Sequence, residues 1–296
     1  MNWLISRPGA SRWLLLGLLL IQVGCSSTTF LYNRLDTLIG WYLSDYVTLS
    51  REQRKDFDGR VNELLDWHRA EELPRYVVWL TAFEASLEDG LSESELDHLL
   101  DQVEAAADRL QERVLNLLLD FGTTLSAEQR LEFVQTLQSD QANLEEKYLN
   151  RSDEEYIGAI EKQFQKNLGR FLGSLSEAQK NTIRTGSETY IRLDFLWVED
   201  RARWVAQLDA LLRIDDPAWP EQARKIYQLR RANRGSDYEQ AFAHNTDVSR
   251  QLVRAVINQR TPKQDRRLRR EIHQYRADFE DLISRGEPLS REALGL

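Results

Sequence analysis

Apolar residues recur every three or four positions through most of the chain from Phe30 onward. This spacing matches the turn of an α-helix and places the apolar side chains on one face. No convincing run shows the two-residue alternation of a half-buried β-strand. The pattern therefore predicts an all-α fold. The clearest stripes are Leu31, Leu35, Leu38, Ile39, Tyr42, Leu43 and Tyr46; Phe57, Val61, Leu64, Leu65 and His68; Leu96, Leu99, Val103, Ala107, Leu110, Val114, Leu117 and Phe121; and Leu268, Ile272, Tyr275, Phe279 and Leu282.

Short polar motifs mark where several of these helices begin. In a capping box, the serine accepts a hydrogen bond from the third helical amide, and a Gln or Glu at that position reaches back. Three segments have the form Leu-Ser-x-x-Gln and one ends in Glu: Leu49–Gln53, Leu125–Gln129, Leu175–Gln179 and Leu91–Glu95. We expect an elongated bundle of about nine or ten helices, mostly in antiparallel hairpins. It forms a single domain over residues 30–296, or one with a sub-bundle boundary near residues 215–220.

The first 24 residues have the pattern of an export signal. Arg7 and Arg12 precede the apolar run Trp13–Val23, which covers 11 residues. A bilayer span needs about 20 apolar residues, whereas this length suits the apolar region of a signal peptide. Small residues flank Cys25, which is the only cysteine of the chain.

This arrangement resembles a bacterial lipoprotein signal, in which the cysteine becomes the acylated N-terminus. The resemblance implies that residues 1–24 are removed, that Cys25 carries the lipid, and that residues 25–29 form a short tether. Gln22 departs from the leucine that is usual at that position of such signals. Ordinary signal-peptide cleavage and an uncleaved short anchor are the alternatives. Ser26 is not the aspartate linked to inner-membrane retention, so we expect the outer membrane, on its periplasmic side.

Two further resemblances concern the mature chain. Residues 30–36, 41–47 and 67–76 resemble the opening of a family of uncharacterised proteobacterial lipoproteins, most strongly within residues 25–80. This resemblance implies the anchor and the helical fold, and it supplies no activity. The Leu-Ser-x-x-Gln segments also resemble the Leu-Thr-x-x-Gln motif of small periplasmic helical chaperones, although helix capping alone would produce the same spacing.

The charge and the motifs limit the function. The net charge is −9, and it becomes −11 without Arg7 and Arg12, which argues against a nucleic-acid partner. The segment Glu95–His98 is the only Glu-x-x-His, whereas a di-iron bundle needs two. The chain has no His-Glu-x-x-His, no glycine-rich phosphate loop and no Gly-x-Ser-x-Gly. We therefore expect no cofactor and no catalytic residues; the alternative is an envelope hydrolase with a site in an aromatic and charged groove.

The candidate groove lies along one helix. Asp194 and Arg201 fall within an apolar stripe when residues 190–204 are projected on a helix. Charges inside such a stripe are destabilising unless they are paired. They either form structural ion pairs with other helices or line a groove that binds a ligand between aromatic walls. The candidate groove residues are Tyr190, Asp194, Trp197, Arg201 and Trp204.

A second candidate site is basic. Residues 224–276 contain 14 Arg or Lys against five acidic residues. On the helix that begins after Thr261, Lys263, Arg266 and Arg270 fall opposite the apolar stripe. This basic face either packs across the acidic remainder of the protein or binds an anionic lipid, a glycan or an envelope protein.

Two single residues complete the predictions. Trp41 lies off the apolar stripe of its helix, so it is a candidate membrane-interface contact or a contact with another helix. His68 lies within a stripe, so we expect a core residue that is hydrogen-bonded to a neighbouring helix. Together these features predict a periplasmic lipoprotein of the outer membrane with a binding, scaffolding or chaperone-like role.

Overall fold

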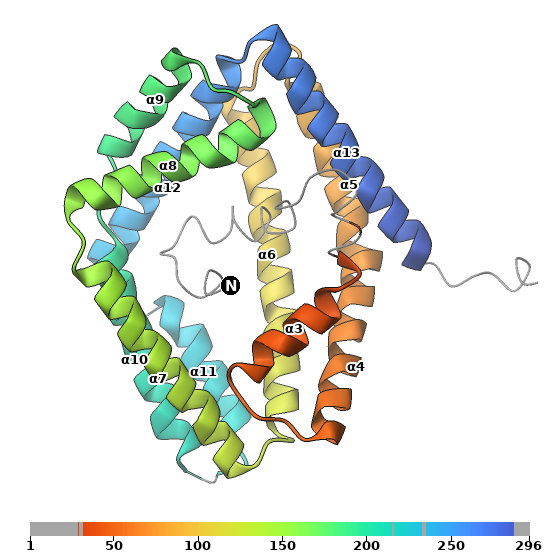
Figure 1. Cartoon of the computed structure of the whole chain (residues 1–296), viewed down its shortest axis with the longest axis vertical. Helices are drawn as coiled ribbons and strands as arrows, with labels where there is room; N and C mark the ends of the chain where they lie inside the picture. The colour runs from red at the N-terminus through yellow and green to blue at the C-terminus, as the bar shows by residue number, and fades with distance from the viewer. Residues whose placement is uncertain (1–28, 30–31, 215, 233–234, 287–296) are drawn as a thin grey trace, which may run out of the picture.

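The computed structural model describes residues 29, 32–214, 216–232 and 235–286, and their regular elements are all helical (Figure 1). The predicted all-α fold is confirmed. A π-helical turn, η1 (His68–Glu72), joins α4 to α5, so the described residues form ten separate helical rods, in agreement with the predicted nine or ten. The α-helices are α3 (Leu35–Ser44), α4 (Arg51–Trp67), α5 (Leu73–Ser86), α6 (Glu93–Gly122), α7 (Ala127–Leu149), α8 (Asp153–Leu172), α9 (Glu177–Glu188), α10 (Asp194–Leu212), α11 (Trp219–Ala232), α12 (Ser236–Asn258) and α13 (Pro262–Gly286).

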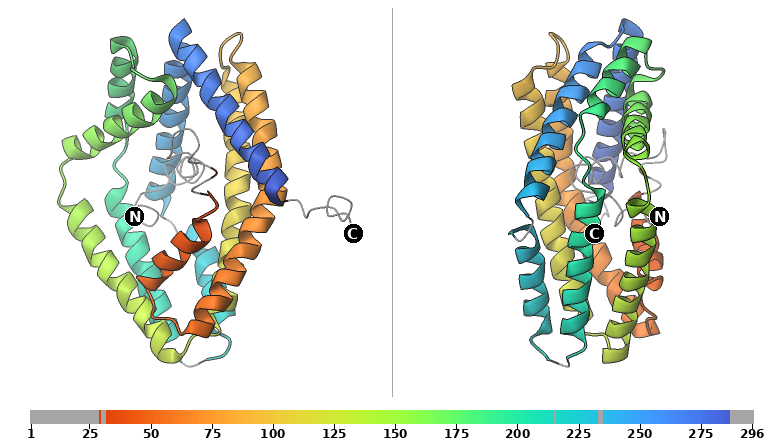
Figure 2. Two further views of the ribbon diagram at one scale, coloured as in Figure 1. Left: turned by 45° about the vertical axis from the view of Figure 1, so that its right-hand side comes forward. Right: turned by 90° about the vertical axis from the view of Figure 1, so that its left-hand side faces the viewer.

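The helices are arranged as a flattened ring (Figures 1 and 2). Along the ring, α13 packs on α5 and α8, α9 packs on α8 and α12, and α10 packs on α7 and α11. Both α11 and α12 also contact the long α6. The turned view in Figure 2 places α3 and α8 on one side of the ring and α6 and α12 on the other. The proposed boundary near residues 215–220 falls between α10 and α11, which pack on each other.

The apolar core is divided around this ring. One cluster joins α6, α9, α12 and α13 through Leu96, Ile183, Val256 and Leu268. Another joins α7, α10 and α11 through residues such as Val134. Because each helix contributes one apolar stripe, each cluster buries the stripes of several neighbouring helices. The ring is therefore held together by local cores along its circumference.

Capping boxes start five helices, as the sequence motifs predict for four of them. In each box the serine hydroxyl accepts from the third helical amide, and the Gln or Glu there accepts from the serine amide. Thr261 and Gln264 make the same two contacts at the start of α13. The serines are Ser50, Ser92, Ser126, Ser152 and Ser176, of which only Ser152 was not predicted.

Four of the capping glutamines have a second role, because they join helix starts in pairs. The side-chain amides of Gln53 and Gln129 exchange two hydrogen bonds of 2.9 and 2.8 Å, which tie α4 to α7. Gln179 and Gln264 exchange bonds of 3.2 and 2.9 Å, which tie α9 to α13. In each case Oε1 caps the residue's own helix while Nε2 crosses to the partner. A glutamate lacks the Nε2 donor, which explains why these four boxes contain Gln.

We expect Ser126→Ala to lower the free energy of unfolding by about 1 kcal/mol, because the backbone N–H of Gln129 loses the hydroxyl oxygen that accepts its hydrogen bond. Urea denaturation measures this change. Gln129→Glu keeps the capping oxygen and removes the crossing donor, so it isolates the link to Gln53. A loss of only a few tenths for Ser126→Ala would contradict the cap.

Candidate functional site

The predicted basic face of α13 is exposed. Lys263, Arg266 and Arg270 point to solvent, opposite the buried side chains of Leu268 and Ile272. Among the described residues, none of the three cations has a carboxylate within 4 Å. The carboxylates of the same stretch are occupied by other arginines: Asp265 pairs with Arg260 at 2.7 Å and Arg269 at 3.0 Å, and Glu271 pairs with Arg267 at 3.8 Å.

Helix α8 carries a second basic stripe, which the sequence analysis missed. Lys162, Lys166 and Arg170 are four residues apart and so share one face of the helix, opposite the buried Leu168. Lys162 and Lys166 are exposed, and within the described part of the chain neither has an ion-pair partner. The regular spacing of these three cations was the signal that could have revealed them.

Contacts at the end of α8 bring the two basic stripes together. Arg170 Nη2 donates to the Tyr275 hydroxyl at 2.9 Å, and Arg267 Nη2 donates to the Arg170 carbonyl at 3.1 Å. Gly173 ends α8 with a φ of 79°, and a Cβ there would lie 3.2 Å from Arg267 Cδ. Glycine is favoured at this position, since it allows both the left-handed backbone and the close approach of α13.

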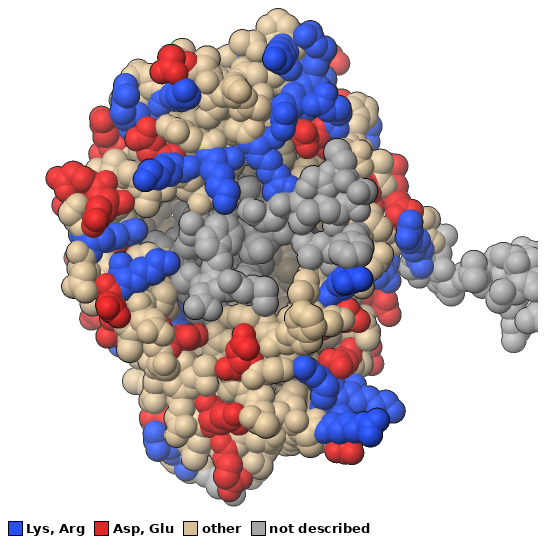
Figure 3. All heavy atoms as spheres, viewed as in Figure 1, with Lys and Arg blue, Asp and Glu red and all other residues tan. Residues whose placement is uncertain are grey.

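Figure 3 shows Lys and Arg side chains gathered over α8 and the adjoining part of α13. We call this surface the α8–α13 basic face. Elsewhere, exposed cations such as Lys180, Arg203 and Arg213 have carboxylate partners within 4 Å. The lysines of α8 and the three cations of α13 therefore combine several like charges whose field no described carboxylate within 4 Å cancels. Its members are Lys162, Lys166, Arg170, Lys263, Arg266 and Arg270.

The charged end of the candidate groove is a buried ion cluster. Asp194 is fully buried, and its carboxylate accepts from Arg151 Nε at 2.5 Å and Arg192 Nε at 2.8 Å. Arg192 also pairs with Asp153 at 2.9 Å. The Arg151 guanidinium lies over the ring of Tyr148, 5.0 Å from its centroid. The predicted structural ion pair is therefore present for Asp194.

Arg201 is buried as well, but it is not paired with Asp194. Its Nη1 donates to Gln141 Oε1 at 2.6 Å, and no described carboxylate lies within 4 Å of the guanidinium. Burial lowers the pKa of Arg201, while the nearby Asp140 acts in the opposite direction. The expected ion pair for Arg201 is thus wrong, because a side-chain amide of α7 partly replaces the carboxylate. Arg201 Nε and Nη2 have no hydrogen-bond partner among the described residues.

The aromatic members of the candidate groove are separated. Trp197 is buried against Tyr148, with the two ring centroids 5.9 Å apart. Trp204 is half-buried beneath the Arg230 guanidinium, and the Tyr190 hydroxyl bonds Ser249 on α12. Since Asp194, Trp197 and Arg201 are inaccessible, these residues do not line an open groove. The structural alternative is the one that the burial supports.

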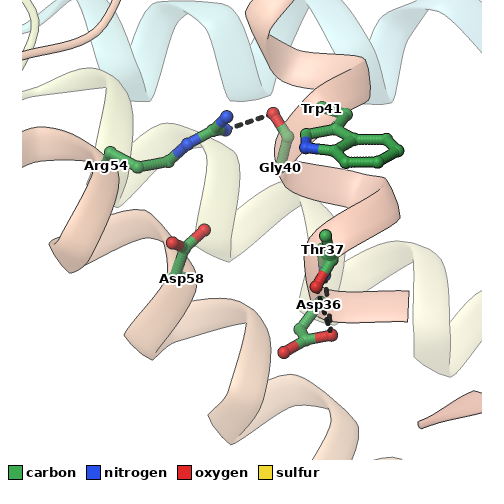
Figure 4. Close-up of a pocket in the computed structure, with 6 residues that line it drawn as sticks. All are labelled: Asp36, Thr37, Gly40, Trp41, Arg54 and Asp58. Carbon is green, nitrogen blue, oxygen red and sulfur yellow. Dashed lines mark hydrogen bonds between the residues drawn. The ribbon is translucent and has the colours of Figure 1, made fainter. Parts of the chain in front are cut away.

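Trp41 borders a small pocket of about 170 Å³ between α3 and α4 (Figure 4). Its side chain is 62% exposed, so the alternative of packing against another described helix does not hold. Arg54 donates to the Gly40 carbonyl and to Ser44 Oγ, and a Cβ at Gly40 would lie 2.9 Å from Arg54 Nη1. In Figure 4 the indole ring points away from Arg54 and Asp58.

His68 is a core residue, as predicted. The Tyr32 hydroxyl lies 3.0 Å from Nδ1, and the Tyr76 hydroxyl lies 3.3 Å from Nε2. Burial lowers the His68 pKa to about 4, so the ring is neutral at pH 7. One π-turn further on, the buried Glu72 carboxylate accepts from Arg109 Nε and Nη2 at 2.6 and 2.7 Å. These contacts hold Tyr32, just before α3, and Arg109 of α6 against the α4–α5 rod.

Some of the sequence predictions concern residues that the structure does not describe. Cys25 and the export signal lie outside the described residues. In the part of the chain that is described, no three or more His, Cys, Asp or Glu side chains form a group that could hold a metal ion. None of the described helices has the length and apolarity needed to cross a membrane.

The fold and site define an all-helical protein that carries a basic face on the outside of a ring of helices. A family model matches residues 45–239, about two thirds of the chain, and the chain belongs to this family of unknown function, DUF6279. The predicted membership of an uncharacterised family is therefore confirmed. No curated protein matches the chain, and no solved structure does.

Proposed function

We propose that this protein is a lipid-anchored binding protein of the outer membrane that holds an anionic partner on the α8–α13 basic face. The observation that carries the proposal is the set of exposed cations on α13 without a described carboxylate partner. A cationic side chain near an anionic surface contributes about 1 kcal/mol of attraction. An exposed ion pair within the protein contributes only about 0–1 kcal/mol. Binding an anionic partner therefore costs little even where an exposed ion pair has to break.

The membrane part of the proposal rests on the sequence. The signal-like segment ends at Cys25, and only residues 26–29 separate this cysteine from the first apolar residue of the mature chain. An acyl anchor at Cys25 would therefore hold the ring close to the periplasmic surface of the outer membrane. Scaffolding by such an anchored body is compatible with the same basic face.

Two other roles have less support. The hydrolase alternative relied on an open groove, whereas Asp194, Trp197 and Arg201 are packed inside the protein. A chaperone-like role relied on the Leu-Ser-x-x-Gln motifs, whose glutamines are used in helix capping and in the crossing bonds between helix starts. We therefore favour binding through the surface cations.

The basic face is tested with the mature chain carrying Cys25→Ser and with vesicles of phosphatidylglycerol and phosphatidylcholine. We expect sedimentation with the vesicles at low salt, and its loss as salt shortens the Debye length below about 10 Å. Replacing Lys263, Arg266 and Arg270 by Gln should abolish binding without changing Tm. The control replaces Lys180, Arg203 and Arg213 by Gln, which removes the same charge from paired positions. Equal loss in both triple variants would refute a specific face.

The anchor is tested in cells with Cys25→Ser in the full chain. We expect the variant to move from the membrane fraction to the soluble fraction after a high-salt carbonate wash, because no acyl chain is attached. Its folding is checked by the Tm of the purified protein. A variant that stays in the washed membranes would favour the uncleaved short anchor.

A further inference from the structure

We infer that the partner of the α8–α13 basic face is the anchoring membrane itself, and that the side of the ring carrying α3 and α8 lies on its anionic phospholipids. In this orientation the exposed Trp41 reaches the lipid interface. The inference rests on the proposed function, because it uses both the lipid at Cys25 and the basic face. It adds the identity of the partner and the orientation of the protein.

The first support is the position at which the chain enters the fold. Tyr32 is buried in a cluster with Leu73, Tyr275 and Phe279, so it is fixed against α13. Tyr32 follows Cys25 by seven positions in the sequence. A fully extended chain of this length reaches at most about 24 Å. An acyl group on Cys25 therefore cannot lie far from the middle of α13.

The basic residues lie within the same range. Arg270 and Lys263 precede Tyr275 by 5 and 12 residues on one continuous helix. At the helical rise of 1.5 Å per residue, they lie roughly 8 and 18 Å from Tyr275 along the axis. The tether is therefore long enough for the lipid anchor and the basic face to contact the same membrane surface.

A third support is the content of this side of the molecule. The views in Figures 1 and 2 place α3 and α8 on the same side of the ring, and Figure 3 shows the basic side chains over α8 there. Trp41 is exposed on α3, and tryptophan is favoured at membrane–water interfaces. Asp36 and Asp58 also line the Trp41 pocket, where the side chains of Arg54 and Asp58 both approach Gly40 of α3.

The overall charge makes this orientation selective. The net charge is −9 for the full chain and −11 without Arg7 and Arg12, so anionic headgroups repel most of the surface and attract the basic face. Lipid chains and a basic patch are independent membrane signals whose contributions combine. The lipid attaches the protein, while the basic face and Trp41 determine which side is turned to the bilayer.

The orientation can be measured because the mature chain with Cys25→Ser has no cysteine. A single cysteine is introduced at Thr37, one turn from Trp41, or at Ala105, an exposed position on α6. Each is labelled with bimane and mixed with phosphatidylglycerol vesicles that contain nitroxide lipids. We expect strong quenching of the probe at Thr37 and none at Ala105.

Trp41→Ala should weaken vesicle binding several-fold at unchanged Tm, whereas Val78→Ala, an equally exposed apolar change on α5, should not.

The outcomes separate this inference from the proposed function. Vesicle binding with equal quenching at both positions, or with quenching only at Ala105, would overturn the orientation and leave the basic face as a binding site. Binding of heparin without binding of vesicles would overturn the membrane as partner. Failure to bind both the vesicles and heparin would refute the proposed function and this inference together.

Discussion

Asp194→Ala should lower the free energy of unfolding by about 3–5 kcal/mol, because it leaves two arginines beside an empty buried position. Arg151 and Arg192 both donate to this carboxylate, and their side chains are themselves mostly buried. Some water can still reach the two guanidinium groups once Asp194 is removed. The loss should therefore fall near the lower end of that range, as measured by urea denaturation.

Asp153 provides the matched control for this change. It contacts the same Arg192, but its side chain is 77% exposed. An exposed ion pair contributes about 0–1 kcal/mol, so Asp153→Ala should have only a small effect. Similar losses for the two variants would show that burial does not strengthen the cluster around Asp194.

Acidification from pH 6.5 to pH 4 should lower the stability by about 3 kcal/mol through His68 alone. Above pH 6.5 the imidazole is neutral in both the folded and the unfolded chain. Below pH 6.5 the unfolded chain takes up a proton, while burial keeps the folded ring neutral down to a pKa of about 4. Stability is therefore fully present above pH 6.5 and is lost as the pH falls towards 4. The measurement is a series of urea denaturation curves between these values.

The surroundings of His68 define the control for this series. Glu72 raises the pKa of His68 and Arg69 lowers it, both less than burial does, and burial raises the pKa of the facing phenols of Tyr32 and Tyr76. Carboxylates elsewhere also titrate in this range, so the informative quantity is the difference between wild type and His68→Gln. His244→Gln, at an exposed histidine, should retain the wild-type pH dependence. Parallel curves for wild type and His68→Gln would contradict the prediction.

The fold class and the helix starts could be predicted because both are encoded locally. Helical periodicity and a serine followed three residues later by Gln or Glu are visible in any short window of the sequence. The exposure of Lys263, Arg266 and Arg270 follows from the same periodicity. The stripe of Lys162, Lys166 and Arg170 has the same helical spacing, so it could also have been predicted from the sequence.

The partners of the buried charges could not be predicted in this way. Arg151 precedes Asp194 by 43 residues, and Arg109 follows Glu72 by 37. Periodicity shows that Asp194 faces inward, but not which helix lies against it. The closure of the helices into a ring likewise depends on contacts between distant segments, such as those of α6 with α11 and α12.

The paired glutamines have a consequence for how the chain assembles. One pair closes a loop of 76 residues, from Gln53 to Gln129, and the other a loop of 85 residues, from Gln179 to Gln264. The two loops share no residue, so each can close without waiting for the other. Loop-closure entropy grows only slowly with length, so the two closures carry similar entropic penalties. The ring can therefore form from two parts that order separately and then join where α13 packs on α5 and where α11 and α12 pack on α6. Helices α7 and α8 are the chain that connects the two loops.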